Sequence, residues 1–388
     1  MKLSDVYPPE NHVQDLYCDT CKGHLDLVFE DFHEDVSGVD ISISGLPALR
    51  CEACKRDHLP DGSRFAIIKL HEQAVDKSVA SVNVVRRKTD EKFNFTPVPF
   101  LYDSDDYLYI PGLKRPFNRG FLTPVFFNKE VLLKYEASPI YRVKFASTTY
   151  GDISSDDFLI SFGINKNGKV VVWLGDIAKL PEAEQYYLRS ENIESDHSIG
   201  SEFYEGQIDC IYTEPSNENK LFALRSEFVD ACFTRFGTKI AHLDNEVLNL
   251  ALEFNAPVVD TDKERRHAAD TLNKIYIESF DNAALASIMA RAGADPKGLG
   301  SLKRLQAVLE PIATGGDIPM LLSPLYVLYD LRVAYSHLTS ADKAEEILKS
   351  VTDRLSMNAT SGLLQIYERL TGKLAASFEA LTVIVKAT

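Results

Sequence analysis

Four cysteines near the N-terminus have the spacing of a tetrahedral metal site. Two residues separate Cys18 from Cys21, and after 29 further residues Cys51 and Cys54 repeat the pattern. Two residues between cysteines let a tight turn aim both sulfurs at one metal ion, and two such turns supply four thiolates. Four thiolates leave no open position for water or substrate. The pattern therefore predicts a structural Zn²⁺ ion rather than a catalytic one.

Disulfide bonds are the alternative for these cysteines. The first residues lack the apolar stretch of a signal peptide, which predicts a cytoplasmic protein. Because the cytosol is reducing, metal binding is favoured over disulfides. His33 and His58 lie near the cysteines in sequence and are expected at the surface, since four thiolates suffice. Cys210 and Cys232 stand alone and are expected to be buried apolar residues.

Arg332 and His337 could together act on a phosphodiester. In a helix, five positions correspond to about 140° of rotation and about 7.5 Å of rise, so the two do not share a face. Arginine is long, however, and His337 comes at the expected helix end, so both could reach one cleft. Histidine transfers protons near neutral pH, and arginine binds phosphate oxygens. This pairing suits RNA cleavage without a metal.

The segment Arg332-x4-His337 resembles the Arg-x4–6-His motif of the HEPN superfamily, over about residues 237–345. The resemblance implies an all-helical domain and a metal-independent endoribonuclease, a toxin or an antiphage-defence effector of toxin–antitoxin or antiviral systems. It implies Arg332 and His337 as catalytic residues, RNA as substrate, and a homodimer whose two motifs form one cleft. The chain departs from many active members at Val333, where they carry a polar residue. The cysteine segment resembles the zinc ribbons that precede some bacterial antitoxins.

Two further interpretations stay open. Arg332 could pair with a carboxylate such as Asp330, and His337 could end its helix, where the dipole favours a cation. Asp196 and His197 could instead ligate a metal or transfer protons, provided that other polar residues converge on them. A loop that caps the following segment is the favoured explanation of that pair.

The front of the chain predicts two regions with strands. Residues 1–62 are expected to form the zinc ribbon, with strands at 25–29 and 39–43 in a long hairpin between the cysteine pairs. Residues 63–220 are expected to form a mixed α/β domain. Within it, the Pro-, Phe- and Tyr-rich residues 60–135 predict short strands and turns with little helix. The later part of this region predicts strands at 140–146, 158–164 and 170–174, with a turn at 165–168. It also predicts that Trp173 lies in the core and that a helix begins near Pro181.

Residues 221–388 predict a helical bundle. Apolar residues recur there at spacings of three and four, interrupted by glycine and proline. The expected helices span 221–236, 241–254, 261–280, 282–292, 299–312, 318–337, 340–356 and 361–385. The predicted fold class is thus α+β multidomain: zinc ribbon, mixed middle domain and all-α HEPN-like bundle.

Charge is spread unevenly along the chain. The formal net charge is −15, and residues 222–388 carry 18 Lys and Arg against 21 Asp and Glu, a net of −3. The remaining −12 lies in residues 1–221, which therefore repel nucleic acid at long range. No apolar run approaches the roughly 18 residues of a membrane span, so no membrane partner is expected.

Two functions of different classes follow. The first is the HEPN-type endoribonuclease, with the ribbon and acidic region sensing a trigger or holding a defence or antitoxin partner protein. The second is a non-catalytic interaction protein, in which a zinc ribbon and a HEPN-like scaffold bind a protein or nucleic acid. Val333 and the net charge of −15 favour the second.

Overall fold

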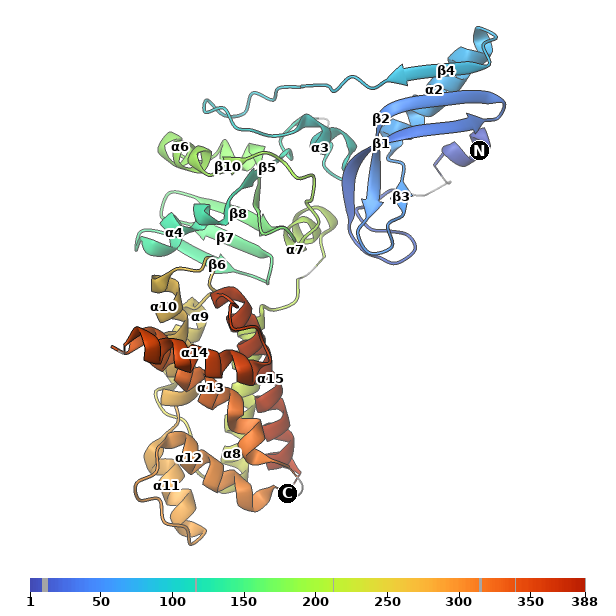
Figure 1. Cartoon of the computed structure of the whole chain (residues 1–388). Helices are drawn as coiled ribbons and strands as arrows, with labels where there is room; N and C mark the ends of the chain where they lie inside the picture. Colours follow the sequence, from blue (N-terminus) through green and yellow to red (C-terminus); the bar gives the residue numbers. More distant parts are fainter. Residues whose placement is uncertain (9–12, 116, 212, 314–315, 339, 388) are drawn as a thin grey trace. The chain divides into compact units, whose positions relative to one another are not determined.

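A computed structural model describes residues 1–8, 13–115, 117–211, 213–313, 316–338 and 340–387 (Figure 1). The chain forms two compact units, Met1–Glu214 and Pro215–Thr388. The first unit is mixed α and β and contains the four cysteines; the second is helical. This agrees with the coarse fold class expected from the sequence.

A four-stranded sheet opens the first unit. Its two long strands form the expected hairpin between the cysteine pairs, with each strand longer than predicted. The third strand pairs antiparallel with the end of the second, and the fourth runs parallel to the start of the second. The strands are β1 (Leu25–Val36), β2 (Val39–Cys51), β3 (Asp57–His58) and β4 (Ser81–Val85).

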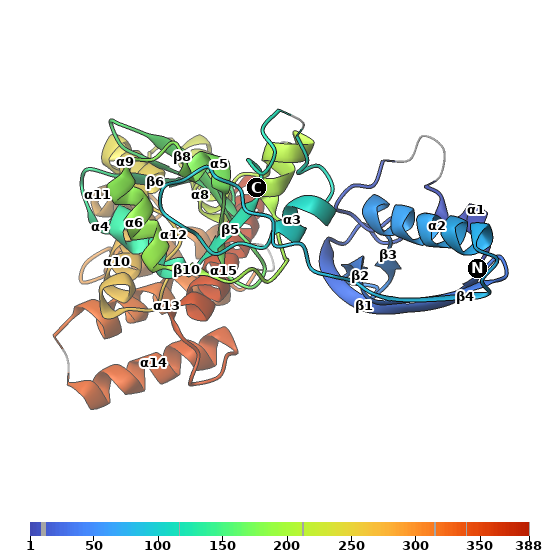
Figure 2. The same cartoon turned by 90° about the horizontal axis from the view of Figure 1, so that it is seen from above.

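The helix α2 (Asp61–Asp76) contradicts the prediction of little helix in residues 60–135. It lies along the hairpin in Figure 2, and its buried Ile67, Ile68 and Ala74 join the core beneath the sheet. These positions have helical spacing. The prediction missed the helix because the Pro- and Phe-rich stretch that follows dominates the composition of residues 60–135. After α2, β4 returns to the N-terminal sheet and pairs with β2.

A second, antiparallel sheet fills the rest of this unit, in the order β10-β5-β9-β8-β7-β6. The three expected strands correspond to β6, β8 and β9, and Gly168 turns between the last two with φ of +74°. The other three strands were not expected, because they are short or polar. The bounds are β5 (Pro124–Phe127), β6 (Arg142–Phe145), β7 (Tyr150–Ser154), β8 (Leu159–Ile164), β9 (Val170–Trp173) and β10 (Asn192–Ile193).

Short helices make up the remaining regular structure of the first unit. Trp173 is 1% exposed and stacks on Phe203 with ring centroids 4.8 Å apart, which confirms it as a core residue. The helix expected near Pro181 begins at the next residue. The helices are α1 (Leu3–Val6), α3 (Ser104–Tyr109), η1 (Lys129–Leu132), α4 (Leu133–Ala137), α5 (Leu174–Ile177), α6 (Glu182–Ser190), α7 (Glu202–Tyr204) and η2 (Glu205–Asp209).

The second unit contains all eight expected helices. Ser216, Thr261, Asp281 and Asp317 cap four of them with side-chain oxygens, as the sequence chemistry of helix starts requires. The helices are α8 (Asn217–Phe236), α9 (Asp244–Glu253), α10 (Asp262–Asn273), η3 (Lys274–Glu278), α11 (Asn282–Arg291), α12 (Ser301–Leu309), η4 (Glu310–Ile312), α13 (Ile318–Ser336), α14 (Ala341–Leu355) and α15 (Leu363–Lys386).

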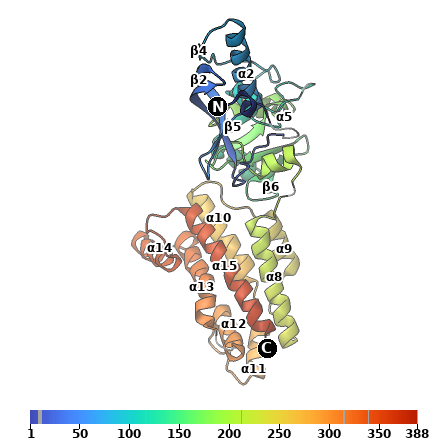
Figure 3. The same ribbon diagram turned by 90° about the vertical axis from the view of Figure 1, so that its right-hand side faces the viewer.

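Helix α13 is the centre of this bundle; it carries Arg332, and His337 is the residue directly after its last turn. It contacts α10, α12, α14 and α15, while α15 also packs along α8 (Figure 3). Leu325, Leu328 and Leu331 are the buried stripe of α13 and belong to one core that all these helices share. Because this stripe is buried in the core, the polar residues of α13, including Arg332, lie on its other faces.

Candidate functional site

The two cysteine pairs are held by turns with the same backbone geometry. Lys22 and Lys55, which follow the pairs, both have φ of 60°. Their N–H groups donate to the carbonyl oxygens of Cys18 and Cys51, each over 2.9 Å. Gly23 lies beside the sulfurs, and a Cβ there would meet the Cys51 Sγ at 3.2 Å. The chain thus builds the same cysteine-bearing turn twice.

The four sulfurs meet at one point. All lie within 4.8 Å of one another; the Sγ atoms of Cys18 and Cys54 are 3.6 Å apart, and those of Cys21 and Cys51 are 3.4 Å apart. In a zinc tetrathiolate with bonds of about 2.3 Å, the sulfurs would be about 3.8 Å apart. The structure therefore brings together all four predicted ligands at a spacing that suits a metal ion.

Electrostatics also favour a cation there. Burial opposes ionisation of Cys18, but hydrogen bonds from the backbone of Cys21 and Thr20 lower its pKa to about 5. The backbone of Arg56 lowers the pKa of Cys54, yet burial and the neighbouring sulfurs raise it to about 11. Sulfurs this close cannot all be thiolates unless a positive ion shares the site.

The other cysteines and the nearby histidines follow the predictions only in part. His33 is exposed as expected, whereas the His58 side chain is only 14% exposed because β3 pairs it with β2. Cys232 is buried as expected, and burial raises its pKa to about 12. Cys210 is exposed, which contradicts the expectation. It ends η2 in a left-handed conformation, outside the sheet core.

Arg332 is held by carboxylates of its own chain. Its Nε lies 3.2 Å from Asp270 Oδ1 on α10, and one terminal nitrogen lies 3.4 Å from Glu278 Oε1 in η3. The expected partner Asp330 instead pairs with Arg354 of α14. Sequence spacing could not show this, because Asp270 is 62 positions away. One guanidinium thus faces two negative charges.

His337 lies at the C-terminal end of α13 and does not join the cluster of Arg332 and its two carboxylates. It is the residue after the last helical turn, its N–H donates to the Val333 carbonyl over 3.4 Å, and its side chain is exposed. Within the described residues, no contact joins its imidazole to Arg332. A single chain therefore does not assemble the two side chains into one cleft. The terminal position agrees with the structural interpretation of His337.

His197 has a buried acidic partner, but it is not Asp196. Its Nδ1 lies 2.6 Å from Oδ1 of Asp106 on α3, and Asp106 is fully buried. Ser195 Oγ donates to the other oxygen of Asp106 over 2.7 Å. Asp196 points elsewhere and accepts from Asn165. The convergence that an Asp-His site would need is thus present, although with a different aspartate.

Charged side chains from the segment after β4 surround this pair. Arg86 binds Asp105, and Lys88 donates to Asp103 over 2.6 Å, so these two carboxylates beside Asp106 each have a cation. Burial raises the pKa of Asp106. Burial lowers the pKa of His197, but the hydrogen bond and charge of Asp106 outweigh it and raise that pKa. Sequence reasoning missed the run Asp103-Ser-Asp-Asp106, whose signal is a side-chain-capped helix start.

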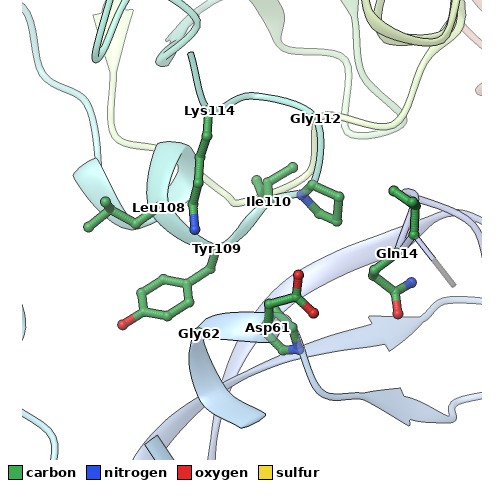
Figure 4. Close-up of a pocket in the computed structure, with 11 residues that line it drawn as sticks. Gln14, Asp61, Gly62, Leu108, Tyr109, Ile110, Gly112 and Lys114 are labelled. Carbon is green, nitrogen blue, oxygen red and sulfur yellow. The ribbon is translucent and has the colours of Figure 1, made fainter. Parts of the chain in front are cut away.

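A small hollow also lies in the first unit, at the start of α2. Its volume is about 190 Å³, and Gln14, Asp61, Tyr109 and Lys114 are among its lining residues. Figure 4 shows the Asp61 carboxylate and the Lys114 chain facing this hollow from α2 and from the loop after α3. One charge of each sign gives it no preference for anions or cations.

Comparison with family models, curated proteins and solved structures finds no match for this chain. Among the described residues, no helix is long and apolar enough to cross a membrane.

Proposed function

We propose that this chain is a metal-stabilised binding protein whose helical unit is a non-catalytic, HEPN-like scaffold. The contacts of Arg332 carry this proposal. A guanidinium placed between Asp270 and Glu278 is already neutralised, so an RNA phosphate would have to approach two carboxylates to reach it. The net charge of −15 adds to that repulsion.

The metal in this proposal is Zn²⁺, held by Cys18, Cys21, Cys51 and Cys54. Four thiolates in two closely matched turns form a donor set that binds zinc in preference to harder cations. Zinc would supply a crosslink between the two ends of the β1–β2 hairpin, without an open position for chemistry. Support comes from the sulfur spacing and from the need for a cation among four sulfurs.

A second candidate function, the HEPN-type endoribonuclease, is favoured by one observation. His337 is exposed at a helix end, where a second protomer could reach it. In this alternative a homodimer completes the cleft, Arg332 binds the scissile phosphate after leaving its carboxylates, and His337 transfers protons. The protein would then be a cytoplasmic toxin or antiphage effector acting on RNA, with the first unit holding a partner protein.

One experiment separates the two. Cells would express the wild type, Arg332→Ala, His337→Ala and the matched control Arg354→Ala, with and without phage challenge, and total RNA would be run on gels. The scaffold proposal expects the same RNA pattern in all four strains under both conditions. Cut RNA that either Arg332→Ala or His337→Ala abolishes, while Arg354→Ala retains it, would establish the nuclease instead. Circular dichroism of the purified variants checks that each is folded.

A further inference from the structure

Strand β4 forms an open edge of the N-terminal sheet (Figure 1). It runs parallel to β2 and packs on α2. The Asp40 N–H donates to the Ala80 carbonyl over 2.9 Å, and the Arg86 N–H donates to the Ser44 carbonyl over 3.0 Å. Because the backbone groups of a strand alternate between its two sides, the even-numbered residues from 80 to 86 are those that face β2.

The backbone groups of Ser81, Asn83 and Val85 point to the other side of β4. Within the described residues, no strand pairs with this side, and no hydrogen bond reaches these N–H and carbonyl groups. All three residues are exposed, and Val85 is exposed by 74%. The outer edge of β4 therefore offers the alternating donors and acceptors that an added strand would pair with.

The other open edges of the first unit are protected, and β4 is not. Natural sheets use bulges, charges and short strands at their edges to prevent unwanted pairing. β1 has a bulge between Glu30 and Phe32 and exposed acidic residues around it, and β6 exposes Arg142 and Lys144. β3 and β10 contain two residues each. Residues 81–85 keep one continuous register and include no charge and no proline, so this edge is suited to pairing.

The two ends of this edge are positively charged. Residues 77–89 include four cationic side chains and no carboxylate. Arg86 and Lys88 are bound by carboxylates of α3, which holds the end of β4 in place. Arg87 after the strand and Lys77 before it are exposed, and neither has an acidic partner among the described residues. A strand with acidic residues beyond both ends would neutralise them, since opposite charges on neighbouring strands attract.

A second copy of this chain fits the edge poorly. Antiparallel pairing of β4 with itself, centred on Asn83, would set Arg87 of each copy opposite Val79 of the other. The cations would then stay without carboxylates. The two copies would also repel each other, because each carries a net charge of −15. The charges of the edge therefore favour a different, locally acidic partner.

We propose that the outer edge of β4 binds an extended segment of a partner protein, in which β-branched residues lie between acidic ends. The segment adds to the sheet as a further strand. Its backbone pairs with Ser81, Asn83 and Val85, and its carboxylates contact Lys77 and Arg87. The inference rests on the binding function proposed above and gives that function a surface and a partner chemistry.

Panning the full-length protein against random peptides displayed on phage tests this inference. We expect the enriched peptides to carry acidic residues next to valine, isoleucine or threonine, because β-branched residues favour the extended conformation. A synthetic peptide of the enriched sequence would then be titrated with the protein, and fluorescence anisotropy would measure its affinity.

Two variants separate the backbone from the charge. Asn83→Pro removes the outward N–H, which an edge strand tolerates, and should weaken peptide binding at least about tenfold. Asn83→Thr keeps that N–H and should bind like the wild type. Arg87→Glu should weaken binding about tenfold by reversing a charge at the edge. Lys69→Glu makes the same change of charge at an exposed position of α2 and should leave binding unchanged.

Several outcomes would overturn the inference. These are that no peptide is enriched, that the enriched peptides are basic, or that Asn83→Pro and Arg87→Glu bind as tightly as the wild type. A wild-type dimer in sedimentation velocity that Asn83→Pro makes monomeric would overturn it as well, because β4 would then pair with a second copy. If circular dichroism shows that Asn83→Pro does not fold, the comparison of Arg87→Glu with Lys69→Glu decides. RNA cleavage in the cells described above would refute the scaffold function instead, without changing these affinities.

Discussion

Asp106 on α3 and His197, 91 positions later, meet in a short contact between groups whose charges depend on pH. The imidazole faces Asp106 and the charges of Asp103 and Lys88, and its edge lies against Phe29. Asp106 outweighs burial, so the pKa of His197 rises above its usual 6.5 on folding. Folding therefore favours the protonated ring. This stability is complete below the unfolded pKa and is lost as the pH rises through the folded one.

We therefore expect His197→Gln to destabilise the first unit more at pH 6 than at pH 8. The reason is that the stabilising contact of the protonated ring with Asp106 is present at low pH and is lost as the pH rises through the raised pKa of His197. Urea unfolding at the two pH values measures this. His33→Gln, an exposed histidine of the same unit, is the control and should show no such difference. If His197→Gln lost the same stability at pH 6 and at pH 8, the stabilising contact of a protonated His197 with Asp106 would be contradicted.

At the scale of elements, local signals predicted structure wherever one period continued undisturbed. The eight helices of the second unit and the β8–β9 hairpin follow from spacing and turn residues. Helix α2 was missed because a proline-rich stretch follows it, and β7 because Gly151, Asp152 and Ser154 make it polar. The cysteine centre was predictable because each of its turns is local. The partners of His197 and Arg332 were not, since they lie 91 and 62 positions away.

Asn165 shows how one residue joins two elements. It is 3% exposed in the β8–β9 turn, where its Oδ1 accepts from the Lys169 N–H over 2.9 Å. Its Nδ2 donates to Asp196 and to the Ser198 carbonyl over 3.1 and 2.9 Å. We expect Asn165→Ala to lower the free energy of unfolding by about 2–3 kcal/mol, because several buried groups lose partners. Asn167→Ala, exposed in the same turn, should cost less than about 1 kcal/mol. Similar losses in both, by urea unfolding, would contradict this role.

At the scale of the whole molecule, the two units have separate cores. The core of the second unit consists only of residues from Leu221 to Val385. In the first unit, Cys18 and Cys51 belong to the same buried cluster as Phe126 and Trp173 of the second sheet. Loss of the proposed metal should therefore reach beyond the cysteine turns to that sheet, and leave the helical bundle unchanged.

Calorimetry with and without a strong chelator tests this separation. We expect two unfolding transitions in the metal-loaded protein. Chelation should lower the midpoint temperature of one transition by about 10 °C. Removing a structural metal costs several kcal/mol of stability, and each kcal/mol shifts the midpoint of a domain of this size by about 2–4 °C. Cys51→Ser should reproduce the shift without chelator and reduce the bound metal, while Cys210→Ser, an exposed cysteine outside the centre, should not. If both transitions moved together, the bundle would depend on the metal, and a cysteine centre confined to the first unit could not account for that dependence.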